Sequence, residues 1–358
     1  MQQDLAPLVD PVALEGYLRE HLPGHAGDGR ATAETRRSIE IERHVAGHSN
    51  ETFFVRLDGR EWVLRRPPRG AFLPTAHDVT REYRVLSALA GTPVRAPRPI
   101  LSCQDTSVIG APFYLMEQVD GVVIRDALSD VFEEDVGSRR AIGEELVDAL
   151  VELHTVDWRT VGLEGFGKPS GYLDRQLRRW NGQLSLTEPL TRRLAELHRV
   201  GSWLADHVPS SPEVTIVHGD YKLDNVAFSP HRPARLAAIL DWEMSTLGDP
   251  LADVGWMLSF WRDATDPKES ILDRQTVTRL PGFQRRDDLV GRYEQRSGRA
   301  VEHLPFYRAL AVLKLAILLE GSYARHLAGQ TDDPFFATLA DGVPALAAMA
   351  LSLTYEDT

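Results

Sequence analysis

The sequence has little cysteine and no excess of basic residues. Cys103 is the only cysteine among 358 residues, which excludes an internal disulfide and a metal site built from several thiolates. Asp and Glu number 52 against 40 Lys and Arg, giving a formal net charge of -12. A nucleic-acid binder needs a basic face that neutralises phosphates, so this composition argues against a nucleic-acid partner.

Long uninterrupted apolar stretches are also missing. Residues 1–18 contain neither a basic segment nor an apolar segment of the kind that forms a signal peptide. The most apolar late stretch, residues 304–321, is interrupted by Arg308 and Lys314, which indicates a buried helix rather than a membrane span. We therefore expect a cytoplasmic protein with no membrane partner. A homodimer is compatible with the sequence.

The N-terminal third has the pattern of an antiparallel sheet with a few helices. Asp10 and Pro11 predict the start of a helix over residues 10–22. Two strand-like segments, 52–57 and 60–66, flank Asp58-Gly59, which is a strong hairpin signal. A second helix is expected over residues 75–91, with Thr75 and Asp78 as its capping box. A further strand is expected over residues 113–119.

Beyond residue 121 the pattern becomes mostly helical. Ile142, Leu146, Leu150 and Leu153 form one apolar stripe at helical spacing. The sequence thus predicts an α+β fold with two lobes, a β-rich lobe over residues 1–118 and a helical lobe over residues 119–358.

Two short apolar segments of the second lobe each end in an acid. Residues 214–217 lead to Asp220, and residues 236–240 lead to Asp241, with Asn225 five residues after Asp220. A single acid in such a position could simply cap a helix. Together, however, these oxygen donors suit Mg²⁺, which usually also binds phosphate oxygens.

These residues lie in two motifs that resemble a known family. Residues 218–225, HGDYKLDN, look like the catalytic loop of the protein-kinase-like fold, and residues 239–256, ILDWEMSTLGDPLADVGW, look like its metal-binding segment. The similarity is closest to the aminoglycoside phosphotransferase and choline kinase group and extends over residues 36–330. It implies ATP and Mg²⁺ as cofactors.

The resemblance implies a role for each matching residue of the helical lobe. Asp220 would accept or orient the proton of the attacking hydroxyl, and Lys222 would neutralise the transferring phosphoryl group. Asn225 and Asp241 would bind Mg²⁺. We expect Asp220 to have no fixed cation beside it.

Three other residues of this lobe are expected to have lesser roles. His218 is expected to hold the loop by hydrogen bonds, and Asp253 to anchor loop backbone. Glu243 could either reach a second metal ion or remain a solvated carboxylate.

In the β-rich lobe the resemblance implies a nucleotide site. The strand position that usually carries lysine carries Arg65, which would bind phosphate oxygens and pair with Glu82. Arg66 should point to the opposite face of the strand. The remaining implied contacts are the phosphate-covering turn, Gly47, Ser49 and Asn50, and the adenine edge, Glu117 and Val119.

The resemblance leaves three hypotheses about the activity: a protein kinase, a pseudokinase and a small-molecule kinase. A protein kinase is disfavoured because only eight residues separate Asp241 from Pro250 and because Gly219 replaces an arginine. A nucleotide-binding pseudokinase would lack one of Asp220, Asn225 or Asp241, and all are present. The sequence therefore favours a kinase that phosphorylates a small-molecule hydroxyl.

The sequence leaves three classes of compound as possible acceptors of the phosphoryl group. Residues 62–70, 114–121 and 218–225 look most like the kinase-like domains associated with acyl-CoA dehydrogenases, which implies a hydroxyacyl thioester or a related hydroxy acid. An aminoglycoside would need a dense carboxylate patch, for which the candidates are Glu133, Glu134 and Asp135. A choline-like alcohol would need an aromatic cage. The candidates for such a cage are Tyr172, Trp180, Trp256 and Trp261.

Overall fold

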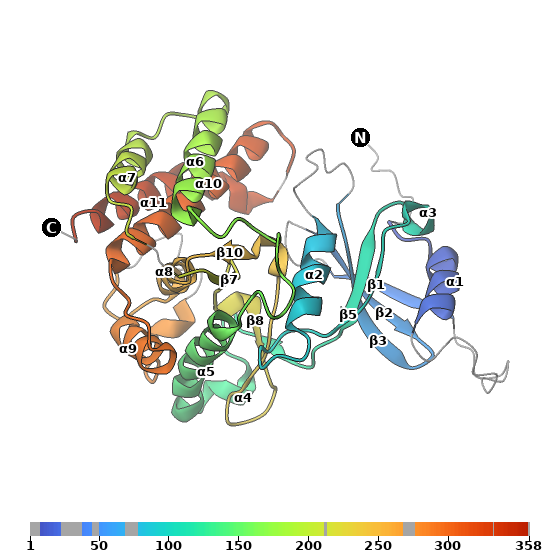
Figure 1. Cartoon of the computed structure of the whole chain (residues 1–358). Coiled ribbons are helices and arrows are strands. Elements are labelled where there is room, and N and C mark those ends of the chain that lie inside the picture. Colours follow the sequence, from blue (N-terminus) through green and yellow to red (C-terminus); the bar gives the residue numbers. More distant parts are fainter. Residues whose placement is uncertain are drawn as a thin grey trace. The chain divides into compact units, whose positions relative to one another are not determined.

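The computed structural model describes residues 8–22, 38–44, 50–68, 78–210, 213–267, 276–331 and 333–356. The chain forms two compact units, Met1–Asp120 and Gly121–Thr358 (Figure 1). The first is built around an antiparallel sheet, and the second is mainly helical. The predicted α+β class is therefore confirmed.

The first unit contains a five-stranded antiparallel sheet in the order β1-β2-β3-β5-β4. Asp58 and Gly59 connect β2 to β3 with φ angles of 50° and 80°, as the predicted hairpin requires. The elements of this unit are α1 (Pro11–His21), β1 (Glu40–His44), β2 (Glu51–Leu57), β3 (Arg60–Arg66), α2 (Val79–Leu89), β4 (Pro99–Cys103), α3 (Thr106–Ile109) and β5 (Phe113–Glu117).

Helices α1 and α2 lie on opposite faces of this sheet (Figure 1). Helix α1 begins at the predicted cap, where the Asp10 carboxylate accepts hydrogen bonds from the backbone N–H groups of Val12 and Ala13. The capping prediction for α2 was wrong. The N-cap is Asp78, one residue before the helix starts, and its carboxylate accepts from the N–H groups of Thr80 and Arg81. Thr75 lies outside the described residues.

The second unit combines small antiparallel sheets with long helices. The strands are β6 (Val122–Val123), β7 (Thr215–Val217), β8 (Val226–Phe228), β9 (Leu236–Ile239) and β10 (Thr246–Gly248). The α-helices are α4 (Asp130–Glu133), α5 (Val136–Thr155), α6 (Tyr172–Thr187), α7 (Ala195–Asp206), α8 (Leu251–Phe260), α9 (Arg286–Ser297), α10 (Leu304–Leu327) and α11 (Leu339–Leu353). Short 3₁₀ turns are η1 (Glu188–Leu190), η2 (Leu223–Asn225), η3 (Trp242–Met244) and η5 (Pro334–Thr338).

Helix α10 lies at the centre of the second unit's main core, packed with α6, α7, α8 and α11 (Figure 1). The predicted buried helix at residues 304–321 is therefore confirmed. By length and composition alone, Pro334–Leu353 could cross a membrane. However, Leu339, Val343, Leu346 and Ala347 of this segment are buried in the same core, as in a core helix.

Candidate functional site

The segment between β7 and β8 forms a tight loop whose conformation depends on Gly219. This residue has a φ of +83°, which side chains with a Cβ rarely adopt. A Cβ placed there would lie 2.6 Å from the backbone oxygen of Met244. Glycine therefore lets the loop approach the segment that carries Asp241 and Glu243.

Two buried side chains hold this loop in place. The His218 ring, fully buried, contacts the Leu240 carbonyl through Nε2 at 2.8 Å and receives the Asp220 N–H at Nδ1 at 3.2 Å. This pattern fits a neutral ring with its hydrogen on Nε2. The Asp253 carboxylate of α8 accepts from the N–H groups of His218 and Gly219 at 2.7 and 2.8 Å. Both expected structural roles are confirmed.

The pKa of Asp253 reflects opposing effects. Burial acts to raise it, but the hydrogen bond and charge of His154 and the loop N–H groups outweigh burial and lower it. The residue is therefore an ionised anchor for the loop backbone.

The Asp220 carboxylate is oriented by hydrogen bonds to both of its oxygens. Trp256 Nε1 donates to Oδ1 at 2.8 Å, and Asn225 Nδ2 donates to Oδ2 at 2.6 Å. The side chain is 20% exposed. Burial raises its pKa, against the lowering effect of the nearby Lys222 and Lys314 charges. The result is a carboxylate fixed in direction and only partly solvated.

The expectation that Asp220 has no fixed cation beside it was wrong. Lys222 Nζ lies 3.6 Å from Asp220 Oδ2 and 3.3 Å from Asp224 Oδ2. Burial acts to lower the pKa of Lys222, but the two carboxylates outweigh burial and raise it. The sequence does not fix this contact, because the direction of the Lys222 side chain depends on the loop backbone, in which Lys222 is the extended residue just before η2.

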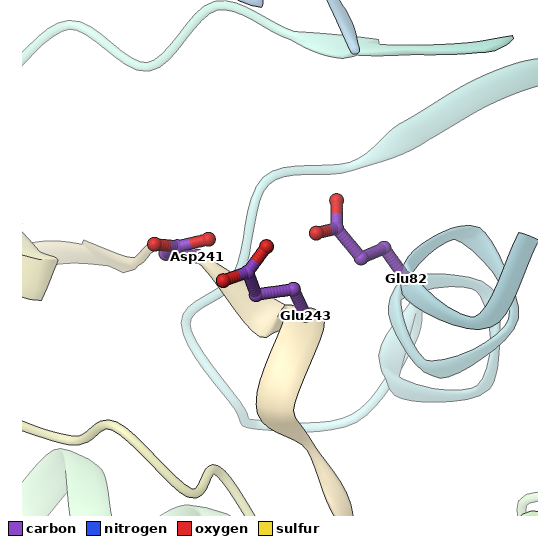
Figure 2. A group of neighbouring side chains, drawn as sticks. All are labelled: Glu82, Asp241 and Glu243. Atoms are coloured by element: carbon purple, nitrogen blue, oxygen red, sulfur yellow. The ribbon is translucent and has the colours of Figure 1, made fainter. Parts of the chain in front are cut away.

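The predicted metal ligands fit a hard cation. Asp241 adopts a left-handed conformation with φ of 61°, and its carboxylate oxygens come within 4.8 Å of those of Glu243. Figure 2 shows both side chains on this short segment. Asn225 directs its amide nitrogen to Asp220, so Oδ1 is the atom that it can offer to a cation. A donor set made only of oxygens suits Mg²⁺.

In the first unit, the Glu82 carboxylate of α2 contacts several polar side chains (Figure 2 shows the Glu82 side chain). It is fully buried and accepts from Tyr114 Oη at 2.7 Å and from Asn50 Nδ2 at 3.0 Å. Arg65 Nε lies 3.4 Å from its Oε2, so the expected ion pair is present. Arg66, on the other face of β3, instead donates to the Ile109 carbonyl at 3.0 Å.

The remaining predicted nucleotide contacts fall at the end of β5 or outside the described residues. Glu117 is the last residue of β5, and its N–H donates to the Arg98 carbonyl at 2.8 Å. Val119 is half-buried in the irregular segment that follows. Gly47 and Ser49 lie outside the described residues.

Comparison with known proteins identifies the family. Residues 40–289 match the phosphotransferase enzyme family. This chain belongs to that family. Mouse acyl-CoA dehydrogenase family member 10 is 36% identical over 320 residues, which cover 89% of this chain and 28% of the mouse protein. The chain spans less than half the length of the curated acyl-CoA dehydrogenase family members that it matches.

Solved structures show the same fold. A candidate aminoglycoside phosphotransferase from Ralstonia eutropha JMP134 is 32% identical, with a TM-score of 0.78 and coverage of 97% of this chain and 98% of that one. A thermostable aminoglycoside phosphotransferase variant solved with ADP and hygromycin B shares 15% identity, with a TM-score of 0.58. It covers 88% of this chain and 95% of that one, and the likeness concerns the fold alone. The kinase-like phosphotransferase fold expected from the motifs is therefore confirmed.

Within this phosphotransferase, two residues near Asp220 are not indicated by the sequence motifs. The sequence suggests an aromatic cage for Trp256, yet its N–H donates to Asp220. Lys314 of α10, which in the sequence only interrupts an apolar stretch, donates a hydrogen bond to the Gly219 carbonyl. The available signal was one lysine inside the apolar stretch of α10 at residues 309–319.

Candidates for the alternative acceptors have structural roles. Asp135 caps α5 by accepting from Gly137 N–H. Trp180 is buried in the main core, and Trp261 is buried with its N–H on the Gln284 carbonyl.

Proposed function

We propose that this phosphotransferase moves the γ-phosphoryl group of ATP to a hydroxyl group of a small molecule. The observation that carries the proposal is the Asp220 carboxylate, oriented by Trp256 and Asn225 and flanked by Lys222. A fixed, partly buried carboxylate is suited to accept a hydroxyl proton, since proton transfer requires a base held in hydrogen-bond reach. A cation beside it is suited to phosphate oxygens.

The proposed reaction forms one bond to phosphorus and breaks another. The acceptor oxygen bonds to the γ-phosphorus, the bond between this phosphorus and the β–γ bridging oxygen breaks, and ADP leaves. The hydroxyl proton passes to Asp220. Lys222 offsets negative charge on the transferring group. Mg²⁺, held by Asn225 and Asp241, would offset the charge of the nucleotide phosphates when bound.

Residues of the first unit would bind the nucleotide. Arg65 is directed by Glu82, which is itself held by Tyr114 and Asn50, so the guanidinium has little freedom to turn away. Such a supported cation is suited to phosphate oxygens. Glu117 and Val119, at the end of β5, would meet the adenine edge.

For the acceptor, we propose a hydroxyacyl thioester or a related hydroxy acid. The support is that the matching curated relatives are named as acyl-CoA dehydrogenase family members. An aminoglycoside acceptor is the second candidate, because the protein from Ralstonia eutropha JMP134 carries that description.

The test is a screen of purified protein with Mg²⁺-ATP against 3-hydroxybutyryl-CoA, 3-hydroxybutyrate, hygromycin B and choline, with phosphorylated product detected by mass. The Asp220→Asn variant is measured in parallel. Its turnover should fall by roughly 10²–10⁴-fold, the usual contribution of a positioned base. ATP affinity should stay close to that of the wild type. If Asp220 merely caps a turn, the variant will melt at a lower temperature and turn over normally, and that outcome would refute the proposal.

A further inference from the structure

Lys314 places a positive charge beside the reacting carboxylate from within a core helix. It lies in α10, where the preceding residues Val312 and Leu313 are fully buried (Figure 1 shows the helix). Its Nζ donates a hydrogen bond to the Gly219 carbonyl and lies 3.9 Å from the centre of the Trp256 ring. Trp256 also donates to Asp220 Oδ1 through its indole N–H. The ammonium group therefore lies close enough to Asp220 for its charge to act on that carboxylate.

This ammonium group has unused hydrogen-bonding capacity. It carries three N–H donors, and among the described residues the Gly219 carbonyl is the one acceptor that it reaches. A partly buried charge without further hydrogen bonds is costly. Burial lowers the pKa of Lys314 to about 8, although the nearby Asp220 and Asp253 carboxylates act in the opposite direction. An oxygen atom from a ligand would relieve this cost.

Lys314 lines a small cavity of the second unit. The other polar or aromatic residues of its lining include Gln176, Trp180, Asp253 and Trp256, and its volume is about 30 Å³. A space of this size holds roughly one or two water molecules. It can admit an oxygen-bearing group such as a carbonyl or carboxylate, while the rest of a larger acceptor stays outside.

We propose that Lys314 binds an acyl oxygen of the acceptor and thereby selects neutral or anionic hydroxy compounds over cationic ones. The acyl oxygen is either the carboxylate of a hydroxy acid or the carbonyl of a thioester. This inference rests on the proposed phosphotransfer to a hydroxyl group at Asp220 and adds the residue that distinguishes between acceptor classes.

The aromatic surroundings support the same selection. A quaternary ammonium ligand needs the open face of an aromatic ring. In this pocket the protein's own ammonium group faces the Trp256 ring and also lies 5.9 Å from the centre of the Trp180 ring. The positive charge of a choline-like head group would be repelled by the Lys314 ammonium group, which already occupies the ring faces of Trp256 and Trp180. Lys314 thus disfavours amino alcohols and polycationic sugars.

The test measures binding by calorimetry in the presence of Mg²⁺-ADP, so that it does not depend on turnover. The probes are 3-hydroxybutyrate, 3-hydroxybutyryl-CoA and choline, and the proteins are the wild type, Lys314→Met, Lys314→Gln and the exposed control Lys168→Met. We expect Lys314→Met to weaken binding of at least one acyl probe by about 10- to 100-fold, the contribution of a hydrogen bond to a charged group. Choline should bind Lys314→Met more tightly than the wild type. Lys168→Met should match the wild type.

Lys314→Gln separates acyl binding from simple support of the loop. Glutamine can still donate to the Gly219 carbonyl but carries no charge. The proposal requires that this variant also bind the acyl probe weakly. Wild-type affinity in Lys314→Gln, combined with loss in Lys314→Met, would mean that Lys314 only anchors the loop, and the proposal would be wrong.

A pH titration gives a second readout. The charged groups that act on Lys314 are Asp220, Asp253, Arg179 and Lys222. Because the pKa of Lys314 is about 8, the ammonium is charged below this pH and becomes neutral above it. Affinity of the wild type for 3-hydroxybutyrate should therefore decrease as the pH rises through about 8, while Lys314→Met should show no such decrease.

The outcomes distinguish failure of this inference from failure of the proposed function. If phosphoryl transfer to an acyl probe proceeds equally in the wild type and Lys314→Met, the function stands and the role of Lys314 is refuted. If no acceptor is phosphorylated but Lys314→Met still loses acyl binding, the function fails and the binding site stands. Binding of choline but of neither acyl probe by the wild type, or binding of none of the probes, would overturn the role of Lys314.

Discussion

At the scale of single residues, Gly219 shows how the loop around Asp220 depends on one missing side chain. Its backbone is left-handed, and its Cα faces the Met244 carbonyl so closely that a Cβ would overlap with that oxygen. The N–H of Gly219 is held by Asp253, and its carbonyl is held by Lys314. The left-handed backbone, the N–H contact with Asp253 and the carbonyl contact with Lys314 would all have to shift to admit a larger residue.

Gly219→Ala should therefore destabilise the protein. The left-handed conformation alone costs roughly 1–3 kcal/mol for a residue with a side chain, and the contact with Met244 adds to this cost. Chemical denaturation measures the loss in free energy of unfolding.

The matched control is Gly182→Ala in α6. No atom lies within 4 Å of a Cβ built there, so alanine should stabilise the helix by about 0.5–1 kcal/mol. Equal stability of the two variants would contradict the conformational role of Gly219.

At the scale of secondary-structure elements, the two neighbouring arginines of β3 have different partners. Successive side chains of a strand point to opposite faces. Arg65 consequently meets Glu82 of α2, whereas Arg66 binds backbone carbonyls that include that of Ile109. Both side chains are buried, so burial alone would not tell them apart.

Substitution of the two arginines should separate nucleotide affinity from stability. Arg65→Ala should raise the KM for ATP by about 10-fold or more, because a charge-assisted contact to phosphate is lost. Arg66→Ala should lower the melting temperature through the loss of its carbonyl contacts and leave this KM close to the wild-type value. Kinetics and thermal denaturation of both variants test the assignment. Equal changes in KM would show that the two faces of β3 do not differ as described.

At the scale of the whole molecule, a ligand that binds only the folded chain stabilises all of it. Mg²⁺-ATP at 100 times its Kd should contribute about 2.7 kcal/mol and raise the melting temperature. EDTA should remove this gain in the wild type. Asp241→Ala should remove it as well, because a metal ligand is lost.

The control for Asp241→Ala is Asp287→Ala, which changes an acid whose side chain is 87% exposed in α9. This variant should retain the stabilisation by Mg²⁺-ATP. Retention of the full shift in Asp241→Ala would exclude Asp241 as a ligand of the nucleotide-bound metal.

Local chemistry made much of this protein predictable from sequence. The cap at Asp10, the hairpin at Asp58-Gly59 and the buried stripe of α5 depend on neighbours a few residues apart. The face of β3 that carries Arg65 follows from strand alternation. The two polar motifs around Asp220 and Asp241 were sufficient to indicate the family, because their residue types and spacing are specific to its chemistry.

Only the tertiary structure decided what surrounds Asp220. Trp256 and Lys314 are 36 and 94 positions away in the sequence, so no local pattern relates them to the acid. Packing of α8 and α10 in the second unit brings the indole N–H to Asp220 and the ammonium group to the Gly219 carbonyl. The motif determined which residue is the candidate base. Long-range packing determined its hydrogen bonds, its neighbouring charge and the space available to an acceptor.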